Sequence, residues 1–149
     1  MSKSIKPVIK WSGSKRSQAY EIVSKIPAYN RYFEPFLGGG SVMYALNPSN
    51  AICSDICEPL IKLWEVIKKD PVGLADYYRE QWERMQKEGY QVYYEIRDRF
   101  NSSFSPYDLL FLSRTCVNGL IRFNRDGHLI THYIIRGREL IPKPLKILF

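Results

Sequence analysis

The sequence has 149 residues, 45% of them hydrophobic and 14% aromatic, a composition that fits one domain with a packed core and excludes a disordered chain. It holds no run of about 18 apolar residues and begins without the apolar stretch of a signal peptide, so we expect a cytoplasmic protein without a membrane segment. The formal net charge of +7 suits a polyanionic partner, because lysine and arginine release counterions from phosphates. A merely solvated basic face would carry the same charge.

The N-terminal half predicts alternating helices and strands. In chain order the pattern gives a helix over residues 15–26, a strand over 32–36, a glycine turn over 38–40, a helix over 41–46, a strand over 51–56 and a helix over 59–70. Two strands with a helix between them form a βαβ unit, which implies a parallel sheet. The last helix is amphipathic, and its inward face is expected to hold Leu60, Leu63, Trp64 and Ile67.

From residue 71 onward the composition shifts toward tyrosine, arginine, glutamate and glutamine, which predicts the helices of a second layer or lobe. One helical face is expected to hold Leu74, Tyr77, Tyr78, Trp82 and Met85. A break is expected at Gly89. Ser105 and Pro106 have the pattern of an N-cap and a first helical residue, so a helix is predicted from residue 107 to 116. Residues 118–127 (NGLIRFNRDG) are rich in turn formers and predict a loop that leads into a hairpin.

Cysteine is used sparingly, since Cys53, Cys57 and Cys116 make an odd count without the spacing of a disulfide framework. Cys53 and Cys57 also lack the second pair of ligands that a zinc site needs. In a reducing compartment these side chains remain thiols. We therefore expect free thiols and no metal site.

The first chemically informative segment is residues 34–40 (EPFLGGG), followed by Asp55 at the end of the next predicted strand. In a doubly wound sheet the turn after the first strand needs glycine where backbone approaches a nucleotide, and an acid ending the second strand can accept hydrogen bonds from both ribose hydroxyls. The pattern therefore favours a nucleoside-bearing cofactor. It lacks the G-x-G-x-x-G spacing, so a nucleotide-dependent oxidoreductase is the weaker alternative. A glycine cluster that only forms a tight turn is the other interpretation left open.

The second informative segment is residues 10–15 (KWSGSK). Trp11, beside a glycine-containing turn, can pack on a flat or cationic ligand, and a nearby lysine ammonium can neutralise a carboxylate. Taken singly, a tryptophan is more often a core residue and a lysine is usually solvated. This segment therefore gains meaning only in combination with the others.

Residues 10–15, 34–42 (EPFLGGGSV), 54–56 (SDI) and 118–127 together resemble the Dam-type DNA adenine-N6 methyltransferases. That family has, in this order, a K-W-x-G-x-K opening, an F-x-G-x-G cofactor motif, a recognition lobe and an Asp-Pro-Pro-Tyr catalytic motif. The resemblance implies an α/β fold, namely the N-terminal part of a Rossmann-like methyltransferase sheet with a mostly helical DNA-recognition lobe and a hairpin. It also implies S-adenosyl-L-methionine as cofactor, double-stranded DNA as partner, and methyl transfer to adenine N6, with GATC as the expected site.

By the same resemblance, the cofactor-binding residues are Trp11, Lys15, Phe36, Gly38, Gly40 and Asp55, and the DNA-binding residues are Lys10, Asn118, Leu120, Arg122 and Asn124. Arg122 is suited to a bidentate contact with a guanine edge, worth about 1–3 kcal/mol of discrimination, and Leu120 to contact with a thymine methyl group. A phosphate contact or a solvated charge stays open for Arg122, as does a place in the hairpin core for Leu120. Val117 stands where some relatives carry an aromatic residue, which leaves a stacking contact during base flipping open.

The resemblance divides the chain into the start of a cofactor-binding domain (1–56), a DNA target-recognition lobe (57–128) and an atypical tail (129–149). The Asp-Pro-Pro-Tyr motif, whose acceptors engage the amino hydrogens of the extruded adenine, is not in the sequence. We therefore expect a truncated chain that transfers no methyl group. One added base in a back-translated tail restores a family-like G-x-F-N continuation, which suggests a frameshift. A non-catalytic DNA-binding module is the rival interpretation, and the existence of a restriction endonuclease partner stays open.

Overall fold

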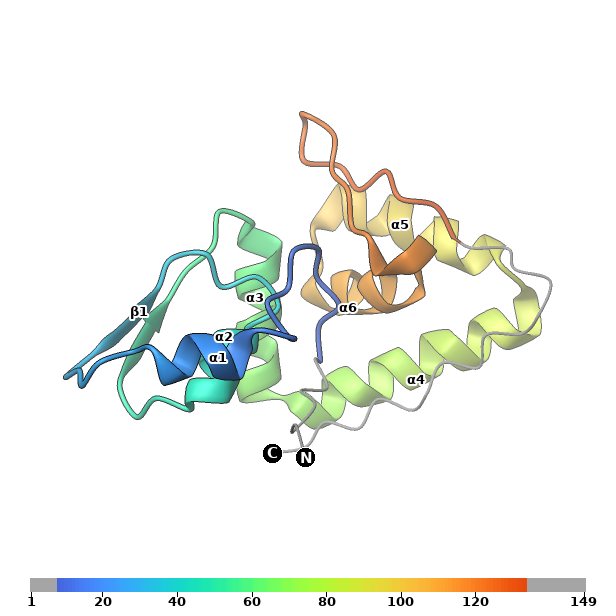
Figure 1. Ribbon diagram of the computed structural model, residues 1–149. Coiled ribbons are helices and arrows are strands. Elements are labelled where there is room, and N and C mark those ends of the chain that lie inside the picture. The colour runs from blue at the N-terminus through green and yellow to red at the C-terminus, as the bar shows by residue number, and fades with distance from the viewer. Residues whose placement is uncertain (1–7, 134–149) are drawn as a thin grey trace.

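Two groups of elements make up the computed structural model, which describes residues 8–133 (Figure 1). The first group contains β1 (Tyr32–Glu34) and β2 (Ala51–Cys53), together with α1 (Ala19–Ser24) and α2 (Ser41–Leu46), which pack against each other. The second group is helical and contains α3 (Glu58–Lys69), α4 (Pro71–Glu88), α5 (Gln91–Ser103), α6 (Pro106–Thr115) and the short 3₁₀ turn Val117–Gly119. Because α3 follows β2 directly and packs on α4 and α6, it joins the two groups.

The strands β1 and β2 pair in parallel, with Tyr32 opposite Ala51 and Glu34 opposite Cys53. A parallel pair needs a crossover connection, and α2 lies in it. The predicted order of strand, glycine turn, helix and strand is therefore confirmed, although both strands are shorter than predicted. The order of a larger Rossmann-like sheet stays a prediction.

The helix predicted over residues 15–26 is also shorter in the structure. It begins at Ala19 and ends at Ser24. Ahead of it the Gln18 backbone N–H donates to the Lys15 carbonyl at 2.9 Å and closes a separate turn. Residues 12–18 therefore belong to a loop, which leaves them free to line the cavities described below.

Local signals set the ends of the longer helices. At the start of α4 the Asp70 carboxylate accepts a hydrogen bond from the Gly73 N–H at 2.9 Å. The helix ends before Gly89, whose φ of 93° lies in the region that favours glycine, so the predicted break is confirmed. Pro106 opens α6 as predicted, but the Ser105 hydroxyl makes no capping hydrogen bond with the described residues.

The core of the helical group is centred on α6, whose residues Leu109, Leu110, Phe111 and Leu112 are fully buried. They join a cluster with Leu60 and Leu63 of α3, Leu74, Tyr78 and Met85 of α4, and Tyr93, Ile96 and Phe100 of α5. Burying a side chain of this size is worth about 1.5–3 kcal/mol relative to exposure, so this cluster makes a large contribution to the stability of the lobe. The predicted inward faces of α3 and α4 are confirmed, with Trp64, Ile67, Tyr77 and Trp82 partly buried at their margins.

A buried charge links three of these helices. Asp108 of α6 is 1% exposed, and its carboxylate accepts hydrogen bonds from Arg99 Nε at 2.9 Å, from Arg99 Nη2 at 2.7 Å and from the Tyr77 hydroxyl. A buried carboxylate is costly unless it is paired and hydrogen-bonded, and a bidentate arginine meets both needs. Burial and the adjacent carboxylate raise the pKa of Tyr77, so the phenol stays protonated and donates.

After α6 the chain runs out and back beside α5 (Figure 1). It forms isolated antiparallel bridges between Cys116 and Tyr133 and between Phe123 and Leu129. No strand is assigned to this part of the described chain, so the expected hairpin stays a prediction. Leu129 and Thr131 are buried, so the first residues of the segment expected as an atypical tail pack onto the lobe. The rest of that tail, residues 134–149, lies outside the described residues.

The cysteines are free thiols, with Cys53 and Cys57 half-buried and Cys116 buried. Burial raises the pKa of the Cys116 thiol to about 11, so it stays protonated and unreactive at neutral pH. None of the helices over residues 8–133 is long and apolar enough to cross a membrane.

Candidate functional site

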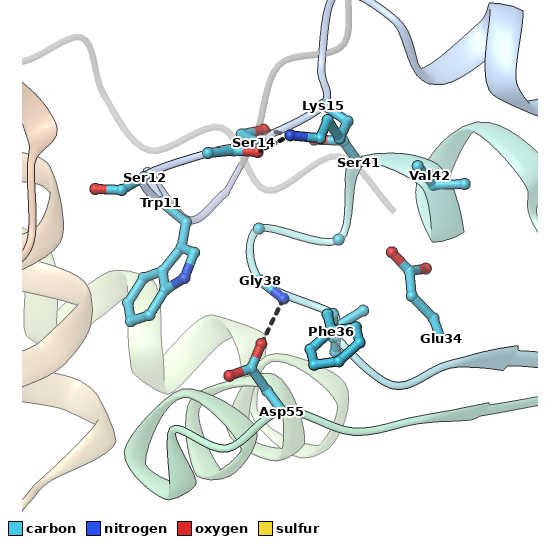
Figure 2. A pocket seen from close by; sticks show the side chains of 14 residues that line it. Trp11, Ser12, Ser14, Lys15, Glu34, Phe36, Gly38, Ser41, Val42 and Asp55 are labelled. Atoms are coloured by element: carbon cyan, nitrogen blue, oxygen red, sulfur yellow. Dashed lines mark hydrogen bonds between the residues drawn. The ribbon is translucent and has the colours of Figure 1, made fainter.

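A pocket of about 220 Å³ lies between the glycine turn that follows β1 and the loop of residues 11–15 (Figure 2). Its lining includes every residue that the sequence pointed to for the cofactor, namely Trp11, Lys15, Phe36, Gly38, Gly40 and Asp55. The fold therefore brings together the N-terminal loop, the turn after β1 and the end of β2. This is the position at the carboxyl ends of parallel strands where α/β sheets bind ligands.

The glycine turn is tight because a tryptophan from α3 packs against it. Gly38 and Gly40 have φ of 50° and 63°, and a Cβ added to Gly40 would lie 2.7 Å from Cζ2 of Trp64. Trp64 also donates a hydrogen bond from Nε1 to the Gly38 carbonyl at 2.9 Å. Sequence reasoning placed Trp64 on the inward face of its helix but missed this role. The turn therefore presents bare backbone to the pocket on one side and is fixed on the other.

Asp55 holds the turn from the end of β2. Its Oδ2 accepts a hydrogen bond from the Gly38 N–H at 2.9 Å, drawn in Figure 2, and its Oδ1 accepts one from the Cys57 N–H at 3.0 Å. A carboxylate can accept about four hydrogen bonds. Asp55 therefore keeps acceptor capacity for a ligand in the pocket while its orientation is set by two backbone donors.

The loop of residues 11–15 closes the pocket from the other side. The hydroxyls of Ser14 and Ser41 lie 2.7 Å apart in a hydrogen bond that ties this loop to the start of α2. Lys15 donates from Nζ to the Gly13 carbonyl at 3.2 Å. In Figure 2 the rings of Trp11 and Phe36 lie on either side of the hydrogen bond between Gly38 and Asp55. Phe36 is 85% exposed, so a large apolar surface stands open at the pocket.

Glu34 is a pocket residue that sequence reasoning did not single out. Its Oε2 accepts a hydrogen bond from the Tyr32 hydroxyl at 2.9 Å. Burial raises the pKa of Glu34, and the opposing effect of this hydrogen bond is smaller. The sequence position of Glu34 could have indicated this role, because Glu34 ends the first strand just as Asp55 follows the second. The pocket thus combines carboxylates, the Lys15 ammonium and aromatic surface, which suits a ligand with hydroxyls, a positive group and a carboxylate.

A larger cavity of about 460 Å³, called the groove below, shares lining residues with this pocket. Its walls are the loop of residues 9–17 and the turn of residues 118–120, and its lining includes the predicted DNA-binding residues Lys10, Asn118 and Leu120. The stem of Lys10 lies against Gly119, where an added Cβ would be 3.2 Å from Lys10 Cδ. Residues 11–14 line both cavities, so a ligand in the groove would lie next to a ligand in the pocket.

The other two predicted DNA-binding residues do not line this groove. Arg122 and Asn124 are exposed on the segment that follows it. The Asn124 side-chain oxygen accepts hydrogen bonds from the backbone N–H groups of Asp126 and His128, each at 2.9 Å. Asn124 therefore shapes its own turn, and only its amide hydrogens remain for another partner.

A polar network that sequence reasoning missed fixes the segment from Leu120 to Arg122. The buried Thr131 hydroxyl accepts a hydrogen bond from the Arg122 N–H at 2.9 Å and donates one to the Leu120 carbonyl at 3.0 Å. Thr131 is anchored in turn by Tyr93 of α5, whose hydroxyl donates to the Thr131 carbonyl at 2.9 Å. Asn101 of α5 pairs with both backbone groups of Leu129, at 2.7 and 3.1 Å. These contacts hold the Arg122 backbone in one position relative to the lobe.

The sequence matches the family described as D12 class N6 adenine-specific DNA methyltransferase over residues 11–140. It is 32% identical over 163 aligned residues to the type II methyltransferase M.MjaIII of Methanocaldococcus jannaschii, which covers 93% of this chain and 54% of the relative. It is 34% identical to a DNA adenine methylase of Serratia marcescens over 80% of this chain and 45% of the relative. Its identity to the type II methyltransferase M1.LlaDCHI of Lactococcus lactis subsp. cremoris is 28%, over 93% of this chain and 50% of the relative.

The chain thus spans about half the length of the curated relatives it matches. The matched region contains the glycine turn, Asp55 and the walls of both cavities. The order of the motifs, the geometry of the pocket and these similarities agree, and the chain belongs to the D12 class of N6 adenine-specific DNA methyltransferases, together with the Dam-type DNA adenine methylases.

Proposed function

We propose that this chain binds S-adenosyl-L-methionine in the pocket beside the glycine turn and double-stranded DNA along the adjoining groove, as part of adenine-N6 methylation. The observation that carries the proposal is the shared wall, because residues 11–14 line both cavities. A methyl donor and a DNA strand held on the two sides of one loop are neighbours, as methyl transfer requires.

The lining of the pocket fits the chemical groups of S-adenosyl-L-methionine, which supplies an activated methyl group on its sulfonium. In this assignment Asp55 accepts the ribose hydroxyls with the capacity that its two backbone donors leave. Lys15 neutralises the methionine carboxylate, and Glu34 faces the positive end of the ligand. Trp11 and Phe36 supply aromatic surface for a flat base or a cation. The left-handed backbone at Gly38 and Gly40 lets the turn approach the ligand closely.

On the DNA side we infer that the segment after α6 reads GATC. The exposed Arg122 suits a bidentate contact with a guanine edge, and Leu120, 39% exposed, suits a thymine methyl group. Lys10 and Asn118 contact the DNA from the groove. Asn124 contributes through its amide hydrogens, because its oxygen is engaged within the turn.

Methyl transfer also requires acceptors for the amino hydrogens of an extruded adenine. The Asp-Pro-Pro-Tyr motif that the family resemblance leads us to expect for this task is not among the 149 residues. We therefore propose that the chain by itself binds both ligands without methylating DNA. Enzyme-dependent formation of N6-methyladenine in a GATC duplex by the purified chain would contradict this part of the proposal.

Calorimetric titration of the 149-residue chain with S-adenosyl-L-methionine tests the function, with NAD as the comparison ligand because dinucleotide sites use a related turn. We expect the methyl donor to bind and NAD not to displace it. We also expect a GATC duplex to bind more tightly than a duplex with one base changed. Preferential binding of NAD would favour an oxidoreductase, and a chain that binds neither the methyl donor nor DNA would contradict the proposal.

A further inference from the structure

The groove beside the cofactor pocket has a lining that suits a phosphate-bearing strand. Among the described residues that form it, Lys10 and Arg16 carry positive charge and none carries a carboxylate. Ser12, Ser14 and Ser17 add hydroxyl groups to the same lining. A concave surface lined by one sign of charge concentrates ligands of the opposite sign, and cations with neutral donors match phosphate and sugar oxygens.

The two cations of the groove are held differently. The stem of Lys10 packs against Gly119, so this contact with the turn of residues 118–120 restrains its position. Arg16 lies further along the loop, in the turn before α1, and its side chain is exposed. Its guanidinium makes no ion pair with any carboxylate over residues 8–133. A guanidinium has the planar donor geometry that phosphate oxygens match.

We propose that Arg16 binds a phosphate of the DNA strand that carries the target nucleotide. The inference rests on the proposed function, because it names one contact of the DNA that this function requires. Residues 11–14 form a wall shared by the groove and the cofactor pocket, so a strand in the groove passes beside the bound cofactor. Arg122 lies outside the groove lining. The two arginines therefore have separate tasks, in which Arg16 contributes affinity through the backbone and Arg122 contributes sequence discrimination through a base edge.

The test compares Arg16→Gln with Arg31→Gln in the full 149-residue chain. Both substitutions remove one exposed positive charge, but Arg31 precedes β1 and does not line the groove. Fluorescence anisotropy measures the binding of a labelled GATC duplex, and of a duplex with one base changed, over a series of NaCl concentrations. Arg16→Gln should reduce the magnitude of the negative slope of log K against log salt by about one unit and weaken both duplexes by the same factor. Arg16→Lys should restore the slope, and Arg31→Gln should leave it unchanged.

Equal slopes of log K against log salt for Arg16→Gln and Arg31→Gln would overturn the phosphate contact. In that case the proposed function would still hold if the wild-type chain binds both DNA and the cofactor. A loss confined to the GATC duplex would also overturn the phosphate contact, because such a loss indicates base reading. The affinity for S-adenosyl-L-methionine should be the same in wild type and Arg16→Gln, since Arg16 does not line the cofactor pocket. A parallel loss of that affinity would mean that Arg16 acts through folding, which overturns the inference. A wild-type chain that binds no DNA would contradict the inference and the proposed function together.

Discussion

Gly40 shows how closely single residues define the pocket beside the glycine turn. Its left-handed backbone excludes most side chains, and the ring of Trp64 occupies the space that a Cβ would need. Trp64 in turn fixes the Gly38 carbonyl through its indole N–H. The tryptophan thus determines the shape of the turn without lining the pocket itself.

We expect Gly40→Ala to lower the free energy of unfolding by about 2–5 kcal/mol, because left-handed strain and overpacking against Trp64 add together. Gly127→Ala is a matched control, since Gly127 has a φ of 78° but no atom within 4 Å of an added Cβ. The control should lose only the backbone strain, about 1–2 kcal/mol. Urea unfolding of both variants measures the difference. Equal losses would show that Trp64 does not constrain position 40.

Arg122→Ala tests base reading at a single residue. If Arg122 contacts a guanine edge, its loss should reduce the discrimination between GATC and single-base variants by about 1–3 kcal/mol, and only at the contacted position. Arg125→Ala removes an exposed arginine from the same loop and should leave discrimination unchanged. Binding of matched duplexes at two salt concentrations separates the outcomes. A uniform weakening of all duplexes, together with a less negative slope of log K against log salt, would identify a phosphate contact instead.

At the scale of elements, the position of residues 120–122, the proposed DNA-reading segment, depends on α5 and on the returning chain. Tyr93 and Asn101 hold the backbone of Thr131 and Leu129, and the Thr131 hydroxyl bridges Leu120 to Arg122. Side-chain hydrogen bonds from α5 therefore attach this segment to the helical core, and its own backbone pairing is limited to isolated bridges.

Thr131→Val should be destabilising by about 1–3 kcal/mol, because the isosteric side chain leaves the Arg122 N–H and the Leu120 carbonyl without their partner. Thr131→Ser keeps the hydroxyl and should lose less. Discrimination of GATC should fall in the valine variant and persist in the serine variant, while cofactor affinity stays the same in both. Equal stability and equal discrimination in the two variants would mean that the hydroxyl does not position Arg122.

Helix ends that are set by a single glycine or proline could be predicted from the sequence. Glycine and proline act on their own backbone, so the break at Gly89 and the start of α6 at Pro106 followed from the sequence. The late start of α1 at Ala19 did not, because the loop before it is tied to α2 by a contact between residues 27 positions apart, Ser14 and Ser41. The residues that line the pocket beside the glycine turn stood out as sequence motifs, whereas the supporting roles of Trp64 and Thr131 arise only from tertiary contacts.

At the scale of the whole molecule, the groove lies at the junction between the strand-containing group and the helical lobe, and the pocket lies beside it in the strand-containing group. The pocket is built from the turn after β1 and the end of β2, whereas the groove takes one wall from the turn after α6. Because residues 11–14 belong to both, the N-terminal loop forms the shared wall of the two proposed ligand sites. Asp55 sets the position of the turn on the cofactor side, which makes it the residue on which the cofactor assignment most depends.

The affinity of the chain for S-adenosyl-L-methionine, with and without the Asp55 carboxylate, is the most direct measurement. We predict that Asp55→Ala loses on the order of 2–3 kcal/mol, about 30- to 160-fold in Kd, because hydrogen bonds from the ribose hydroxyls to a charged acceptor are removed. Asp76→Ala, which removes an exposed carboxylate on α4, should bind like wild type. A cofactor analogue without the ribose hydroxyls should bind Asp55→Ala and wild type with similar affinity, which separates ribose binding from the support that Asp55 gives the turn. Unchanged calorimetric affinity for S-adenosyl-L-methionine in Asp55→Ala would contradict the assignment of this pocket.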